Sequence, residues 1–190
     1  MLFIVRHGQT QANVDGLILG RADPALTELG RRQAAALARA LPGPEVVVSS
    51  PLRRAQETAA AFGVPVETDE RWIELDYGAM DGAVATSIGD DVWTRWRADP
   101  GFAPPGGESL VALGARVRES CDELATDASE RDIVVVTHVS PIKAAVAWAL
   151  GVGDEVAWKL FVEDAAVCRI RIGRFGPLLT AFNERHRPPA

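Results

Sequence analysis

Short apolar, β-branched runs alternate with longer segments of helical period along this chain, and this alternation constrains the fold more than any other feature. The clearest run is DIVVVTH, residues 132–138. We predict strands at residues 2–5, 45–50, 64–67, 132–138, 166–172 and 178–182. Strands that alternate with helices form a mostly parallel sheet with helices on both faces. The sequence therefore predicts an α/β fold, a single three-layer α/β/α domain over residues 1–190.

The segments between these runs carry helix signals. Residues 26–41 place their apolar residues on one face behind Thr27, which is a suitable N-cap, and residues 107–125 form a longer amphipathic stretch. Two serine–proline pairs, Ser50-Pro51 and Ser140-Pro141, predict helices that start with a cap and a proline at the first position.

One irregular region, residues 76–106, is rich in Gly, Asp, Pro and Trp. We expect this region to be a short lid insertion over one end of the sheet. A polar tail, residues 183–190, is expected to follow the last strand.

The composition excludes several classes of partner. The net charge of −6 argues against nucleic acid, because proteins that bind a phosphate backbone need a basic face. A local basic pocket for a small anion remains compatible with this charge. The sequence has neither an apolar run long enough for a membrane span nor room for a signal peptide before Arg6, so we expect a cytoplasmic location. Cys121 and Cys168 have no metal-like or redox spacing and are expected to be packing residues.

Histidines and arginines follow three of the predicted strands at the points where the strands end. Arg6 and His7 follow the first strand, Arg53 and Arg54 follow the second, and His138 ends the strand at 132–138. Ligands of such sheets collect at the carboxyl ends of the strands. Arginine next to histidine disfavours protonation of the imidazole, so this set is best explained by a shared anion. Its charge and geometry suit phosphate, which arginine binds through paired hydrogen bonds.

Five motifs extend this pattern in order along the chain. They are RHGQTxxN at 6–13, SSPLRRAQETA at 49–59, IELDYGAMDG at 73–82, PGGES at 105–109 and VVVTH at 134–138. Together they resemble the histidine phosphatase superfamily, in its phosphoglycerate-mutase-like branch. The resemblance spans residues 1–150, and five ordered motifs are far more specific than RHG alone.

The resemblance implies a role for each of five residues. His7 matches the nucleophile, whose neutral imidazole attacks phosphorus and forms a phosphohistidine. Arg6 and Arg54 match the pair that clamps the phosphoryl oxygens, and His138 matches the second histidine, which donates to the same oxygens. Glu74 matches the general acid that protonates the leaving oxygen.

Three further positions match residues near the phosphate. Asn13 is expected to donate its amide to phosphate, and Gly8 to allow a close backbone approach. Gly20 matches a position at which family members bring the backbone near the substrate.

Two alternatives concern the chemistry of these residues. Asp76, two residues after Glu74, is the rival candidate for the general acid. A metal site built from His7, His138 and Glu74 is conceivable, but a metal cation there would meet the like charge of the adjacent arginines. We therefore expect neither a metal nor a cofactor.

Departures from the family pattern bear on the substrate. Phosphoglycerate mutases of this branch usually read RHGES, whereas Gln9-Thr10 stands here, and the insertion after the glutamate motif is short. Arg95 and Arg97 flank Trp96 instead of forming an adjacent basic pair, and Val139 occupies a position that is often glycine.

These features favour a histidine acid-type phosphatase, which hydrolyses a small phosphorylated metabolite through a phosphohistidine. One alternative is a cofactor-dependent phosphoglycerate mutase, which shares the first half-reaction. An alternative of another class is a non-catalytic module that binds a phosphorylated ligand. Indoles at Trp93 and Trp96 favour a modest or partly apolar leaving group, although these residues and Trp72 could instead anchor the core. The oligomeric state is left open, a homodimer included.

Overall fold

A six-stranded sheet forms the centre of the computed structural model, which describes residues 1–186. Residues 187–190, the end of the expected polar tail, lie outside the described residues. The strand order is β3-β2-β4-β1-β5-β6. The strands are β1 (Leu2–Arg6), β2 (Val47–Ser49), β3 (Val66–Thr68), β4 (Ile133–Thr137), β5 (Ala166–Gly173) and β6 (Gly176–Arg185). The first four in this order pair in parallel, and β5 and β6 add antiparallel at one edge. The predicted mostly parallel α/β sheet is confirmed.

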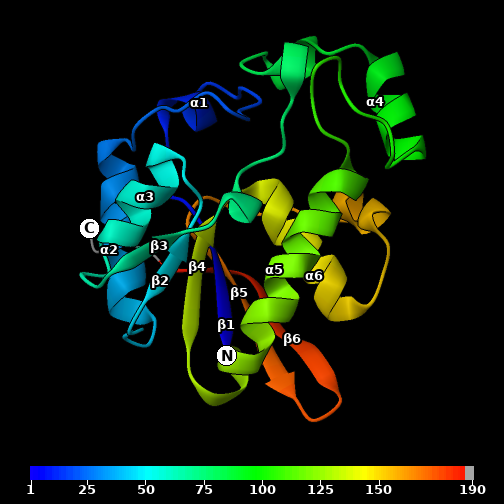
Figure 1. Ribbon diagram of the computed structural model, residues 1–190. Helices are drawn as coiled ribbons and strands as arrows, with labels where there is room; N and C mark the ends of the chain where they lie inside the picture. Colours follow the sequence, from blue (N-terminus) through cyan, green and yellow to red (C-terminus); the bar gives the residue numbers. More distant parts are fainter. Residues whose placement is uncertain (187–190) are drawn as a thin grey trace.

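Helices cover both faces of this sheet (Figure 1). Helices α2 (Glu28–Ala40) and α3 (Arg53–Ala60) lie on one side, and α5 (Leu110–Glu130) and α6 (Val139–Leu150) lie on the other. Side chains of β1 alternate between the two cores: Leu2 and Ile4 pack in the cluster that contains α5 and α6, while Phe3 and Val5 pack with α2 and α3. The three-layer arrangement follows from this alternation.

The segment 76–106 differs from the rest of the chain because it adds no strand to the sheet. It contains the short helices η2 (Gly78–Met80) and η3 (Ala85–Ser87) and the helix α4 (Asp90–Ala98). Figure 1 shows this segment beyond the carboxyl ends of the parallel strands, on the same side as α1 (Gln11–Val14). No helix within residues 1–186 is both long and apolar enough to cross a bilayer.

The helix start predicted at Ser50-Pro51 is wrong by two residues. Helix α3 begins at Arg53, and its N-cap is Leu52, which offers no side-chain cap. The Ser50 hydroxyl instead lies 2.7 Å from Nε2 of His138. The Ser50 oxygen also accepts from the Leu52 N–H at 3.3 Å, so the residue joins a tertiary contact to a local backbone bond just before the helix.

Other predicted boundaries shift by a few residues. Thr27 caps α2 as expected, because its side chain accepts a hydrogen bond from the Gly30 N–H. Helix α6 begins at Val139, so Ser140-Pro141 lie inside its first turn. Strand β6 continues to Arg185 through pairing with β5, which shortens the expected polar tail.

Candidate active site

His7 directly follows β1 at the carboxyl edge of the sheet and is 3% exposed. Its Nδ1 lies 2.7 Å from the Gly8 carbonyl oxygen. A carbonyl only accepts, so Nδ1 carries the proton and Nε2 keeps its lone pair. Burial, and then the charges of Arg54 and Arg6, lower the pKa of His7 well below its usual value. The lowered pKa favours the neutral imidazole, whose Nε2 lone pair is free of a proton.

Arg54 lies in the first turn of α3 and is buried against His7. Its Nε donates to His7 Nε2 at 3.3 Å, and its two terminal nitrogens donate to the carbonyls of Ala22 and Gly20 at 2.7 and 2.9 Å. The two carbonyls fix the plane of the guanidinium beside His7. The neighbouring Arg53 is exposed.

Arg6 ends β1 and is held by the chain that precedes β5. It donates to the Val162 carbonyl at 2.8 Å and pairs with Asp164 at 3.0 Å. Its Nε is buried and has no partner within residues 1–186. An unpaired buried donor is costly, so this nitrogen is available for an acceptor from a ligand.

His138 follows β4 and is fully buried, with its ring centroid 5.1 Å from that of His7. The Ser50 oxygen accepts from the Leu52 N–H at 3.3 Å, so its hydroxyl proton is available to His138 Nε2, 2.7 Å away. Burial and the charge of Arg54 lower the pKa of His138 well below its usual value. With the Ser50 hydroxyl donating to Nε2, the neutral ring carries its proton at Nδ1, which is buried and has no protein partner among the described residues.

Glu74 lies in the loop after η1 (Glu70–Trp72), and its carboxylate reaches the start of α6. It accepts from the backbone N–H groups of Val139 and Ser140, each at 3.1 Å, and from the Leu75 N–H at 2.7 Å. A helix N-terminus offers free N–H groups to an anion, which explains this placement. The carboxylate is 4% exposed and lies next to His138, the N-cap of the same helix.

The backbone around Glu74 is anchored from two sides. Arg116 of α5 donates to the carbonyls of Arg71 and Glu74 at 2.6 and 3.3 Å. The Thr137 hydroxyl at the end of β4 donates to the Trp72 carbonyl at 2.5 Å. These contacts fix the position of the backbone that carries the acid candidate Glu74.

Asp76, the rival acid, has different partners. Its carboxylate accepts from the Gly78 N–H at 2.8 Å and lies 3.5 Å from Arg21. It is 34% exposed and belongs to a surface turn. The geometry therefore favours Glu74 over Asp76 as the proton donor.

Gly8 and Gly20 make close backbone approaches, but to protein atoms. The Gly8 N–H donates to the Thr58 hydroxyl at 3.0 Å, and a Cβ on Gly8 would lie 2.4 Å from the Gly30 carbonyl oxygen. The Gly20 carbonyl accepts from Arg54, and its N–H is bonded to Asp81. Both glycines thus position the site through packing.

Asn13 lies in the short helix α1 and uses its amide oxygen locally. That oxygen accepts from the Thr10 N–H at 2.9 Å in a capping box. The amide NH₂ is the part of Asn13 that remains for a ligand, and its donation to phosphate stays a prediction.

Asp81 takes part in the site in a way that the sequence pattern does not reveal. Its carboxylate accepts from three consecutive N–H groups, those of Gly20, Arg21 and Ala22, at 2.8, 2.8 and 3.0 Å. The carbonyls of this same loop hold Arg54. A carboxylate of the segment 76–106 therefore fixes the loop that aims the arginine.

A cavity of about 190 Å³ adjoins the start of α6 and is called the aromatic cavity below. Its lining residues are mostly apolar or aromatic: Ile18, Leu75, Tyr77, Trp93, Trp96, Leu110, Val139, Ser140, Lys143, Ala157 and Trp158. Lys143 and Trp158 were not identified from the sequence. The available signal for Lys143 was its position four residues after Val139, which places both on one helix face.

The tryptophans expected near the substrate divide into two groups. Trp72 is fully buried in the core, whereas Trp93 and Trp96 stack at 5.7 Å and line the aromatic cavity. Arg95 and Arg97 lie over the rings of Phe102 and Trp158, so both guanidinium groups are engaged in cation–π contacts.

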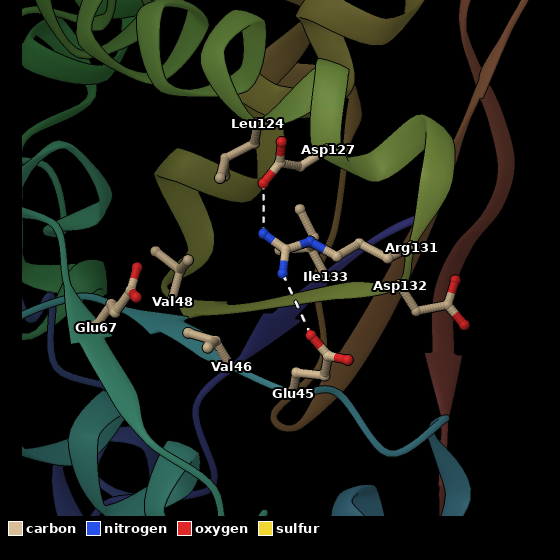
Figure 2. A pocket seen from close by; sticks show the side chains of 9 residues that line it. All are labelled: Glu45, Val46, Val48, Glu67, Leu124, Asp127, Arg131, Asp132 and Ile133. Carbon is tan, nitrogen blue, oxygen red and sulfur yellow. Dashed lines mark hydrogen bonds and ion pairs between the residues drawn. The ribbon is translucent and has the colours of Figure 1, made fainter.

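A second cavity, of about 100 Å³, lies at the opposite, amino ends of β2 and β4. Figure 2 shows Arg131 at its centre, bonded to Asp127 and 3.5 Å from Glu45. Across residues 1–186, no three His, Cys, Asp or Glu side chains cluster in a way that could hold a metal ion.

The profile of the histidine phosphatase superfamily (branch 1) matches residues 2–185, so the chain belongs to this superfamily, as its motifs suggested. It is 36% identical over 176 residues to a bifunctional protein of Mycobacterium tuberculosis, covering 87% of this chain and 48% of that protein. The chain thus spans about half the length of this curated relative.

Two further similarities cover larger shares of the related proteins. A glucosyl-3-phosphoglycerate phosphatase of Mycobacterium tuberculosis is 38% identical over 160 residues, with 75% of this chain and 72% of that protein covered. A solved structure of mycobacterial glucosyl-3-phosphoglycerate phosphatase in complex with VO3 has a TM-score of 0.86 at 33% identity and covers 96% of this chain and 98% of that chain.

Proposed function

We propose that this protein is a phosphomonoesterase that transfers the phosphoryl group of a small metabolite to His7 and then to water. The observation that carries the proposal is the set of donors around His7 Nε2. Arg54 Nε lies 3.3 Å from it, and the buried nitrogens Arg6 Nε and His138 Nδ1 lack protein partners among the described residues. A phosphoryl group supplies the acceptors that this set lacks.

The proposed reaction has two steps. In the first, His7 Nε2 attacks phosphorus, the ester P–O bond breaks, and protonated Glu74 gives its proton to the departing alkoxide. In the second, Glu74 takes a proton from water as the water oxygen attacks the phosphohistidine and the P–N bond breaks. Arg6, Arg54 and His138 bind the phosphoryl oxygens in both steps.

Phosphatase relatives support this choice over the alternatives. The related glucosyl-3-phosphoglycerate phosphatases are named as phosphatases and cover most of this chain. We further propose a single cytoplasmic domain over residues 1–190, with residues 76–106 as its lid, and a small phosphorylated substrate in place of nucleic acid. The proposal leaves the oligomeric state open, a homodimer included.

Phosphate release from an aryl phosphate in excess EDTA tests the reaction. Wild-type protein should release phosphate, and His7→Ala should not. When wild-type protein is denatured during turnover of a substrate labelled in its phosphoryl group, the label should stay on the protein. The bond should be acid-labile and alkali-stable, as expected for a phosphohistidine. Activity that disappears on chelation and returns with a divalent metal would refute the proposal, as would tight phosphate binding without turnover of any ester.

The mutase alternative is tested by the fate of the phosphoryl group. With 3-phosphoglycerate as substrate, phosphate release should exceed conversion to 2-phosphoglycerate. Efficient interconversion that depends on a bisphosphoglycerate primer would instead identify a mutase.

A further inference from the structure

The aromatic cavity is lined by a lysine that makes no direct hydrogen bond or ion pair within residues 1–186. Lys143 is one of only two lysines in a chain that otherwise uses arginine, and it is the only charged side chain among those that line the cavity within residues 1–186. Burial lowers the pKa of Lys143. The nearby charge of Glu74 raises this pKa and the charge of Arg6 lowers it, so that the net shift is downward. A half-buried ammonium group of this kind is stabilised by an anion that enters the cavity.

Two indoles of the same cavity also have unused donors. The Nε1–H groups of Trp96 and Trp158 are buried and have no partner within residues 1–186. Both rings line the cavity and meet edge to face at 5.7 Å. Buried donors without acceptors are uncommon, so their presence on one cavity is a second indication of a ligand.

The chemistry of the missing ligand follows from this donor set. Lys143 and the two indoles only donate, so the ligand must supply acceptor oxygens. A single ammonium balances one negative charge, which fits a carboxylate better than a second phosphate dianion. The rings around it match an otherwise apolar or ring-shaped surface.

We propose that the aromatic cavity receives a leaving alcohol that carries a carboxylate, with Lys143 as the counter-ion of that carboxylate. This proposal rests on the proposed function, because the cavity adjoins Val139 and Ser140, whose N–H groups hold the acid candidate Glu74. Lys143 would thus be a specificity-determining residue, separate from the groups that bind the phosphoryl oxygens.

A matched substrate pair tests the role of Lys143. 3-Phosphoglycerate carries a carboxylate where glycerol 3-phosphate carries a neutral CH₂OH group. Wild-type protein should prefer 3-phosphoglycerate in kcat/KM, and Lys143→Met should reduce this preference by about 10- to 100-fold, mainly through KM for the acid. Trp158→Phe keeps an aromatic wall, removes one donor and should reduce the preference by a smaller factor.

The second lysine provides the control. Lys159 is exposed, so Lys159→Met removes the same charge outside the cavity and should leave the preference unchanged. Binding in a His7→Ala background, followed by the fluorescence of the indoles, gives a readout that needs no turnover. There too, 3-phosphoglycerate should bind more tightly than glycerol 3-phosphate, and Lys143→Met should remove the difference.

Two results would overturn the carboxylate site. One is equal kcat/KM and equal binding of the two esters in wild-type protein. The other is a loss in Lys143→Met that is the same for both esters, which would assign Lys143 to the phosphoryl group. Either result with continued phosphate release leaves the phosphatase proposal standing, whereas binding without release from any ester overturns the phosphatase proposal alone.

Discussion

The two ends of the parallel strands differ in whether their buried or charged nitrogens have partners within the protein. At the amino ends, Arg131 is bonded to Asp127 and lies 3.5 Å from Glu45, so the guanidinium charge of this cavity is paired within the protein (Figure 2). At the carboxyl ends, Arg6 Nε and His138 Nδ1 are buried and have no protein partner in residues 1–186. Both ends have a cavity, but these unpartnered buried nitrogens lie at the carboxyl ends.

The pairing of polar groups distinguishes a structural cavity from one that can bind a ligand. Cavity shape does not distinguish the two ends, because both have pockets of modest size. Ion pairs between surface groups contribute little to the free energy of unfolding, and groups already paired in this way offer no free charge to a ligand. Buried donors without acceptors have a cost in the free protein that a bound anion removes, so they mark where binding energy is available.

The largest effect at the carboxyl ends is expected for Glu74→Gln. A general acid matters most for leaving groups that need a proton, so hydrolysis of alkyl phosphates should slow by about 10²–10⁴-fold. An activated aryl phosphate should slow much less. Steady-state kinetics on both ester types measure this difference.

Asp76→Asn is the matched control for this change, two residues along the chain. It should leave the dependence on leaving group intact, because the Asp76 carboxylate bonds to the Gly78 N–H of its own turn and pairs with Arg21. A selective loss on alkyl phosphates in Asp76→Asn, with none in Glu74→Gln, would reassign the acid.

The next largest effect is expected for Arg54→Lys. Lysine keeps the charge but loses the planar set of donors that contacts His7, Gly20 and Ala22. We expect kcat/KM to fall by about 10²–10³-fold. The adjacent Arg53→Lys should change it by less than about twofold, since that side chain is exposed. Equal losses in both variants would contradict the placement of the guanidinium.

A smaller effect concerns stability and pH. The pKa values of His7 and His138 are lowered in the folded protein, so the unfolded chain binds more protons below about pH 6.5. The free energy of unfolding should therefore decrease as the pH is lowered from 7.5 to 5.5, by up to about 1.4 kcal/mol for each histidine. Urea unfolding at the two pH values measures the change.

A His7→Gln/His138→Gln double variant tests the source of that slope. It should unfold with a visibly weaker dependence on pH, whatever its absolute stability. An unchanged slope would mean that other groups cause the loss in acid.

The smallest effect is expected at the amino ends. Arg131→Met removes two ion pairs of half-exposed groups, which water and salt already screen. Its kcat/KM should stay within about twofold of wild type, and its thermal midpoint should shift little. A large loss of activity would remove the distinction between the two ends.

Much of the fold was predictable because its signals are local. β-Branched runs and helical periods gave the order of strands and helices, and positions at strand ends placed His7, Arg54 and His138 at one edge. Cap signals were less reliable, since the Ser50 hydroxyl bonds with His138 instead of capping α3. A local motif cannot report a competing partner that lies far along the chain.

The parts of the site that sequence reasoning missed depend on contacts between distant segments. Asp81 meets the N–H groups of residues 20–22, and these are ordinary backbone groups without a sequence signature. Lys143 and Trp158 become informative only because the fold brings them to one cavity. Hydrogen-bond satisfaction in three dimensions supplied what the residue pattern lacked.

The position of β1 in the sheet has a consequence for biosynthesis. Leu2 of this strand pairs with Ile133 of β4 on one side and with Ile170 of β5 on the other. Both neighbours leave the ribosome long after β1 does, so a nascent chain carries an apolar strand without hydrogen-bonding partners until its last third is made. Such distant pairing slows folding and exposes intermediates to aggregation. His7, which directly follows β1, therefore reaches its surroundings in the sheet only after β4 and β5 have been made.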